Sequence, residues 1–158
     1  MNEIDSVKFE HAKQDAEAFY KTVGKVSCPY FKEEVVFNAK GIEHIKFTRI
    51  RQARPHQDQY IRFRLLRLAP EIISLSHTLQ GISTRKSFER EKTHSRWEHI
   101  MRSATYYEFV AVVKDVRIRV IVKQVELGPK YFWSIIPFWK MDKMTGAKIM
   151  HSGRPDID

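Results

Sequence analysis

The stretch from Tyr106 to Trp139 has the hydrophobic pattern of three consecutive antiparallel strands. In its middle segment, residues 116–123, valine and isoleucine occupy every second position, and arginine and lysine take most of the positions between them. This period of two predicts a strand with one buried face and one face in water. The flanking segments, 106–113 and 131–139, are rich in aromatic and β-branched residues, and the short links between the segments predict tight hairpins.

Helical spacing of apolar residues dominates the first half of the chain. The helices that we expect cover residues 4–22, residues 39–47 with Asn38 as the N-cap, and residues 56–68 with a kink or break at Pro70 before the helix resumes. The further strands that we expect are a short strand or extended segment at 34–38, the first sheet strand at 82–91, and a short strand or loop at 96–100.

The order of these elements, helices first and then a meander of about four antiparallel strands, predicts an α+β fold. The N-terminal helices are expected to pack on one face of the sheet and to leave the other face open. At 158 residues the chain is long enough to bury a core of its own. We therefore expect one domain over residues 1–150 and a flexible tail at 151–158.

The composition is that of a basic globular protein. Lysine and arginine number 28 against 19 acidic residues, which gives a formal net charge of +9. Such an excess favours polyanionic partners, nucleic acid before an anionic membrane, although it can also serve solubility alone. The single cysteine, Cys28, excludes an internal disulfide and a cysteine-based zinc cluster. The sequence shows neither a membrane-spanning apolar run nor a signal-peptide pattern, so we expect a cytoplasmic site of action and no membrane partner.

The positive charge is concentrated in two places. Three cations share the polar face of the strand at 116–123, and six arginines lie between positions 49 and 67, where Asp58 is the only acidic residue. These arginines either contact phosphates or form an ordinary solvated surface. The residues that the sequence offers as nucleic-acid contacts are Arg49, Arg51, Arg62, Arg67 and Arg117, with Tyr106 as an aromatic that can stack a base.

Metal-independent RNA cleavage is the chemistry that fits the residues best. The sequence contains no H-E-x-x-H metal motif, no G-x-S-x-G motif, no P-loop and no dinucleotide fingerprint. RNA cleavage needs a base for the 2′-OH proton, cations for the phosphorane and an acid for the leaving 5′-oxygen. The candidates are Glu108 or His44 as the base, Arg117, Arg119 and Lys123 as cations, Ser134 as a hydroxyl facing the open side, and Tyr106 or Trp133 as base-stacking aromatics.

Each candidate also has a purely structural interpretation. The carboxylate can pair with an arginine on a neighbouring strand, and the serine can be an ordinary strand residue. The two aromatic residues can belong to the core, and the histidine can lie at the edge of the core. Sequence alone leaves both interpretations open for every one of these side chains.

The order of these features resembles that of the barnase–EndoU–colicin–RelE nuclease superfamily, and is closest to its phage- and toxin-associated branches. The resemblance rests on the histidine-bearing helix Gly41–Ile45, the basic central strand, and a last strand with Ser134 amid aromatic residues. It covers about residues 35–140 and leaves residues 1–34 as a helical extension. It implies a barnase/EndoU-like fold and a small endoribonuclease without a cofactor, often a toxin that is paired with an immunity protein or antitoxin.

Residue by residue, the resemblance implies His44 as acid or base, Arg119 or Lys123 as the phosphate-stabilising cation, and Ser134 as a positioning hydroxyl. A second histidine on the sheet would have to be His94 or His99.

The leading hypothesis is a toxin-type endoribonuclease that works without metal and forms a 2′,3′-cyclic phosphate. Its substrate is RNA, with tRNA as one option, and the protein acts in the cytoplasm, with delivery from another cell or a phage as an option. One alternative is a non-catalytic RNA- or DNA-binding module that uses the same basic face. Another is an interaction or phage structural protein whose basic face meets an acidic partner.

Overall fold

The computed structural model describes residues 5–48 and 51–137. Along the chain the elements are α1 (Ser6–Val23), β1 (Lys25–Cys28), β2 (Glu33–Val36), α2 (Ala39–Lys46), α3 (His56–Leu65), α4 (Leu68–Leu75), β3 (Gly81–Thr93), β4 (Arg96–Val113), β5 (Val116–Val125) and β6 (Lys130–Pro137). Arg49, the predicted end of the last strand after Pro137 and the tail at 151–158 lie outside the described residues. In the described part, no helix is both long and apolar enough to cross a membrane.

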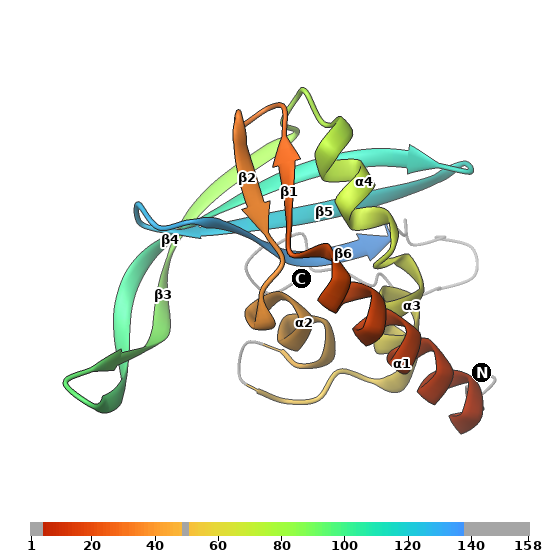
Figure 1. Ribbon diagram of the computed structural model, residues 1–158, viewed down its shortest axis with the longest axis horizontal. Coiled ribbons are helices and arrows are strands. Elements are labelled where there is room, and N and C mark those ends of the chain that lie inside the picture. The colour runs from red at the N-terminus through yellow and green to blue at the C-terminus, as the bar shows by residue number, and fades with distance from the viewer. Residues whose placement is uncertain (1–4, 49–50, 138–158) are drawn as a thin grey trace, which may run out of the picture.

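The fold is α+β, and its sheet has six strands in the order β1-β2-β6-β5-β4-β3 (Figure 1). The four strands β3 to β6 form the meander that the sequence predicts, each antiparallel to the next. The prediction of a four-stranded sheet is nevertheless wrong, because the β1–β2 hairpin extends the sheet beyond β6. The junction is parallel, with Val36 as the partner of Tyr131. The short strand or extended segment expected at 34–38 overlaps β2, but β1 was not predicted, because four residues give too short an alternation to be recognised.

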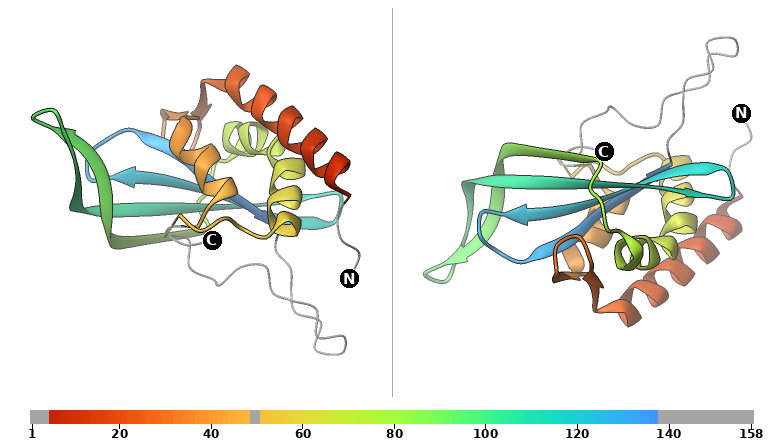
Figure 2. Two further views of the ribbon diagram at one scale, coloured as in Figure 1. Left: turned by 90° about the horizontal axis from the view of Figure 1, so that it is seen from below. Right: turned by 90° about the horizontal axis from the view of Figure 1, so that it is seen from above.

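The main hydrophobic core joins the helices to the sheet. Phe9 and Tyr20 of α1 and Ile73 of α4 are buried with Val120 of β5 and Phe132 of β6, among others. The views in Figure 2 show the helices gathered beside the sheet, while the far end of the β3–β4 hairpin extends beyond them. The buried faces of the helices therefore account for the apolar positions that gave them their helical periodicity.

The break between the third and fourth helices does not fall at Pro70. The helix ends at Leu65, and α4 begins at Leu68 after Leu66 and Arg67. Pro70 lies in the first turn of α4, where a missing N–H costs no hydrogen bond within the helix. The predicted break is thus shifted toward the N-terminus by a few residues.

The polar face of β5 is covered, in contrast to the open face that the sequence predicts. Arg119 is 2% exposed and Lys123 is 3% exposed. They lie beside a second buried cluster that includes Tyr106, Ile121 and Trp133. Alternation along a strand shows which face a side chain points to, but not whether something covers that face. Carboxylates from β4 (Glu108) and β3 (Glu89) pair with these two cations.

The β3–β4 hairpin is long and strongly bent (Figure 1). Its turn residues, His94 and Ser95, both have positive φ, as in the type I′ turns that favour hairpins. In the sheet register Lys123 lies opposite Tyr106 of β4, which lies opposite Ser83 of β3. In a flat sheet Glu89 would be about 20 Å from that position, six residues farther along β3. Its carboxylate is instead 2.6 Å from the Lys123 ammonium, because the hairpin curls back over the sheet.

Helix α2 lies directly against β6. Its N-cap is Asn38, as predicted, and the Asn38 side chain accepts a hydrogen bond from the Lys40 amide. A side chain at Gly41 would place its Cβ 2.5 Å from the Phe132 carbonyl oxygen, so only glycine permits this approach. The close packing fixes the distance at which the next turn of α2, including His44, lies from β6.

Candidate active site

A cleft of about 600 Å³ lies between α2 and the outer part of the β3–β4 hairpin. The residues that line it are Ala39, Lys40, Glu43, His44, Phe47, Thr48, Arg51, Ser87, Phe88, Glu89, Arg90, Trp97, Lys123 and Trp133. They come from α2 and the loop after it and from all four strands of the meander, β3 to β6. The cleft therefore exists only in the folded chain, and it contains two of the predicted catalytic residues, His44 and Lys123.

His44 is held rigidly at the wall of this cleft. It is 4% exposed, and its ring stacks on Trp133 with 4.0 Å between ring centroids and 18° between ring planes. Arg54 donates from Nε to the His44 carbonyl oxygen at 2.9 Å, and its Nη2 lies 3.1 Å from the His44 Nε2. A guanidinium group can only donate, so the Nε2 of His44 accepts and the neutral ring carries its proton on Nδ1.

A chain of polar contacts continues from Arg54 to the last strand. Asp58 lies between two guanidinium groups, with its Oδ2 3.6 Å from Arg54 Nη1 and its Oδ1 2.7 Å from Arg62 Nε. Arg62 in turn donates from Nη1 to the Ser134 hydroxyl at 2.7 Å. Ser134 is therefore linked to His44 through three charged side chains. The two Arg62 contacts are short and charge-assisted, and contacts of this kind position groups firmly.

Arg62 is 1% exposed, which does not fit the prediction of a surface phosphate contact. Its position on the helix does not reveal this, because α3 turns that side chain toward β6. The sequence also offered no sign that Arg54 contacts His44, because Arg54 is one of several arginines in the same cluster. Of the five arginines of this cluster that the structure describes, Arg54 and Arg62 are thus part of the interior of the protein.

Lys123 and Glu89 form a buried ion pair on the other side of the site. The Lys123 Nζ lies 2.6 Å from Glu89 Oε1 and 4.2 Å from the centroid of the Trp133 ring. Trp133 thus contacts both His44 and Lys123. It is the residue left over in the register between β5 and β6, where Ile121 and Val122 pair with Ser134 and Phe132. A bulge of this type re-aims a side chain and is common beside active sites.

Glu89 was missed by the sequence prediction, and no local signal identifies it. It lies among charged residues on a strand whose alternation is weak, and only the bend of the hairpin brings it to Lys123. Its carboxylate lines the same cleft as His44.

Arg119 and Glu108 form a second ion pair, outside the residues that line the cleft. Arg119 donates to both carboxylate oxygens of Glu108, at 2.6 Å and 3.0 Å. This two-point contact matches the structural interpretation of Glu108, in which it pairs with an arginine of the neighbouring strand. The structure therefore separates this pair from His44 and Lys123.

The other predicted nucleic-acid contacts are dispersed. Arg51 is exposed and lines the cleft, whereas Arg117 is exposed at the start of β5 and does not. Tyr106 is 1% exposed, so in this structure its ring is not available to stack a base. His94 and His99 are exposed on the β3–β4 hairpin, and neither lines the cleft.

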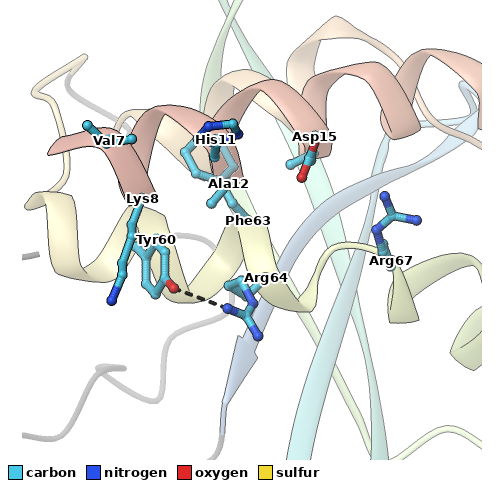
Figure 3. Close-up of a pocket in the computed structure, with 10 residues that line it drawn as sticks. Val7, Lys8, His11, Ala12, Asp15, Tyr60, Phe63, Arg64 and Arg67 are labelled. Carbon is cyan, nitrogen blue, oxygen red and sulfur yellow. Dashed lines mark hydrogen bonds between the residues drawn. The ribbon is translucent and has the colours of Figure 1, made fainter. Parts of the chain in front are cut away.

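Arg67 belongs to a different hollow, a groove of about 760 Å³ between α1 and α3. Figure 3 shows Arg67 and Arg64 on the same side of this groove, with Arg64 hydrogen-bonded to the hydroxyl of Tyr60. Lys8 adds a third cation, and Asp15 is the only carboxylate in the lining. The groove is larger than the cleft beside α2 and is positively charged. It lacks a combination of buried histidine, lysine and glutamate like the one in the cleft.

Two buried polar groups beside His44 have no hydrogen-bond partner in the described part of the chain. They are the Trp133 Nε1 and the Tyr131 hydroxyl. Burial raises the pKa of Tyr131 well above its usual range. Buried polar groups that lack hydrogen-bond partners are uncommon in folded proteins. Within residues 5–48 and 51–137 no group of three or more metal-ligating side chains is present.

Comparisons with protein-family models, with curated proteins and with solved structures find no match to this chain. We therefore infer the function from the chemistry of the cleft.

Proposed function

We propose that the protein is an endoribonuclease that cleaves RNA by attack of the 2′-OH on the adjacent phosphate, without a metal ion. The observation that carries the proposal is the convergence of His44, Lys123 and Glu89 on one cleft. These side chains supply an imidazole, a cation and a carboxylate, which are the groups that the reaction needs. They come from a helix and two strands that are distant in the sequence.

In this proposal Glu89 is the base and Lys123 stabilises the negative charge that develops on the phosphorane. The 2′-OH proton passes to the Glu89 carboxylate as the 2′-oxygen attacks phosphorus. The bond from phosphorus to the 5′-oxygen then breaks, and a 2′,3′-cyclic phosphate forms. His44 donates its Nδ1 proton to the leaving 5′-oxygen, while its Nε2 keeps the hydrogen bond from Arg54. A neutral imidazole can act as the electrophile in this way, and the Arg54 guanidinium balances the negative charge that develops on the ring. The proton taken up by Glu89 returns to His44 through solvent after the products leave.

In this scheme four further residues position the catalytic groups through their contacts: Arg54, Asp58, Arg62 and Ser134. Arg54 orients the His44 ring through the bond to Nε2, and Asp58 holds Arg54. Ser134 anchors the far end of the chain through Arg62. We therefore keep the predicted role of Ser134 as a positioning hydroxyl. We do not keep Glu108 as the base or Arg119 as the phosphate-stabilising cation, because both lie outside the cleft.

The toxin role and its partners belong to the same proposal. The resemblance to toxin-associated nucleases supports an RNA target such as tRNA and a cognate immunity protein or antitoxin. The cleft is basic and the whole protein carries a net charge of +9. This charge favours binding of an acidic inhibitor protein as well as of RNA.

The test is incubation of the purified protein with total RNA in EDTA, analysed on a gel with identification of the new ends. Removal of a general acid or base costs about 10²- to 10⁴-fold in rate, so His44→Ala and Glu89→Gln are expected to lose that much. His77→Ala is the matched control, because His77 is exposed and lies outside the cleft. Discrete fragments with cyclic-phosphate ends, made by wild type and His77→Ala alone, support the proposal.

The opposite result defines the alternative function. If RNA stays intact with all variants but its migration shifts, and salt abolishes the shift, the protein is a binding module and the nuclease proposal is wrong. Fragments from wild type and His44→Ala at equal rates would also exclude the proposed mechanism.

A further inference from the structure

The outer part of the β3–β4 hairpin presents an exposed aromatic and basic face. The register pairs Phe88 with Met101, Arg90 with His99 and Lys92 with Trp97. Directly paired residues and their neighbours two positions away share one face of a strand pair, so these six side chains lie together. Phe88 is 66% exposed, Trp97 60% and Met101 53%. The opposite face carries Glu89, which points to the buried Lys123.

Exposed large aromatic side chains are costly to leave in water, and here they sit beside the cleft that holds His44. Phe88, Arg90 and Trp97 all line that cleft. The Arg90 guanidinium carbon lies 4.6 Å from the centroid of the Trp97 ring, so a cation covers part of the aromatic surface. On the opposite wall, α2 and the following loop contribute Lys40 and Arg51. The face is therefore continuous with a positively charged cleft.

We infer that Phe88 and Trp97 stack unpaired RNA bases along the wall of the cleft, so that the substrate is single-stranded RNA. This inference rests on the proposed function and adds the substrate class. Bases of single strands offer their faces to aromatic side chains, whereas bases in a duplex are already stacked on one another. Arginine beside the ring adds stacking and phosphate contact.

The arrangement also explains why the hairpin is so long. A strand pair that served only the sheet could end near Ser83 and Tyr106, where β5 is still its neighbour. The additional length carries the aromatic face beyond the sheet and, through the bend, toward α2. The same bend sets Glu89 beside Lys123. One element thus links base binding to the proposed catalytic groups.

The experiment uses the full chain and a 2′-O-methyl RNA oligonucleotide, which cannot be cleaved by 2′-OH attack. Affinity is measured by fluorescence anisotropy for the single strand, for the matching duplex, and for an oligonucleotide of the same length with abasic sugars. The variants are Trp97→Ala and Phe88→Ala. Val112→Ala is the control, because Val112 is as exposed as Phe88 but lies at the other end of β4.

The expected result is a loss of about tenfold or more in affinity for the single strand in each aromatic variant and no change in the control. The loss should disappear with the abasic oligonucleotide, because its backbone offers phosphates but no bases. Wild type should bind the single strand more tightly than the duplex. The dependence of affinity on salt should be unchanged in Trp97→Ala, because the substitution removes no charge.

Three outcomes would overturn the inference. Unchanged single-strand affinity in both aromatic variants excludes stacking. An equal loss with single-stranded and abasic oligonucleotides shows a general effect on the fold. Self-association in sedimentation, abolished by Trp97→Ala and independent of RNA, shows that the face joins two copies of the chain. Failure of the nuclease proposal is distinguishable, because it appears as intact unmodified RNA while the stacking dependence of binding persists.

Discussion

Replacement of Gly41 by alanine tests whether α2 is held against β6 as the structure shows. An alanine Cβ at this position would lie 2.5 Å from the Phe132 carbonyl oxygen, 2.5 Å from the Tyr20 hydroxyl and 2.9 Å from Cδ1 of Phe132. One of these neighbours is backbone, so the contact cannot be relieved by rotation of a side chain alone. Helix α2 must move away from the sheet.

The expected loss of stability follows from three contributions. Overpacking of a tight interior contact costs about 1–3 kcal/mol. The Tyr20 hydroxyl donates to the Asn38 carbonyl at 2.5 Å, and displacement of this hydrogen bond costs about 1 kcal/mol more. Alanine has a higher helix propensity than glycine, and this difference stabilises the folded protein by about 1 kcal/mol. The net effect is a loss of about 2 kcal/mol in the free energy of unfolding.

The assay is thermal and urea denaturation followed by circular dichroism. For a chain of this size a loss of about 2 kcal/mol lowers the melting temperature by roughly 4–8 °C. The same movement displaces His44 from the Trp133 ring, so RNA cleavage or binding should fall as well. A second substitution, Tyr20→Phe in the Gly41→Ala background, removes one of the two oxygen contacts and should recover part of the stability.

The refuting result is a Gly41→Ala protein that is as stable as wild type or more stable. Helix propensity would then be the dominant effect, and the close packing of α2 on β6 would be wrong. If Tyr20→Phe recovers no stability and the affinity for RNA is unchanged, the packing of α2 on β6 does not set the geometry of the site.

The remaining predictions concern buried polar groups and pH. Ser134→Ala removes the hydroxyl that accepts a hydrogen bond from Arg62 Nη1 and should cost about 2 kcal/mol in urea unfolding; an unchanged midpoint would show that this contact is not needed. Burial raises the pKa of Tyr131, so above about pH 10 the unfolded chain loses its proton first and stability falls with rising pH. Tyr131→Phe should flatten that fall, and an equally steep decline in the variant would refute the assignment. The hydrogen bond from Arg102 lowers the pKa of Glu91, so its stabilising effect is present above the usual glutamate range and is lost as acid protonates the carboxylate. Arg102→Gln should make the fall in stability with decreasing pH shallower. An unchanged dependence of stability on pH would refute a stabilising contact between Arg102 and Glu91.

Local patterns in the sequence were sufficient for most of the helices and for the order of the meander, but not for the β1–β2 hairpin. The period of two at 116–123 and the short links on either side give β4, β5 and β6 as consecutive antiparallel strands, and Asn38 marks the start of α2. These features depend on backbone periodicity, turn geometry and capping, which act over a few residues. His44 and Lys123, two of the catalytic candidates that the sequence offered, line one cleft in the structure, and their roles are a proposal.

What covers each face and which charges meet were decided only by the tertiary structure. The sequence places Arg119 and Lys123 on one side of a strand, but their partners Glu108 and Glu89 come from other strands, one through the curl of a hairpin. Arg62 and Arg54 belong to a dense basic cluster in the sequence and to the interior in the fold. The physical reason is that periodicity fixes a side chain's direction relative to its own backbone. Burial and pairing depend on contacts between segments that are tens of residues apart, and no local pattern encodes them.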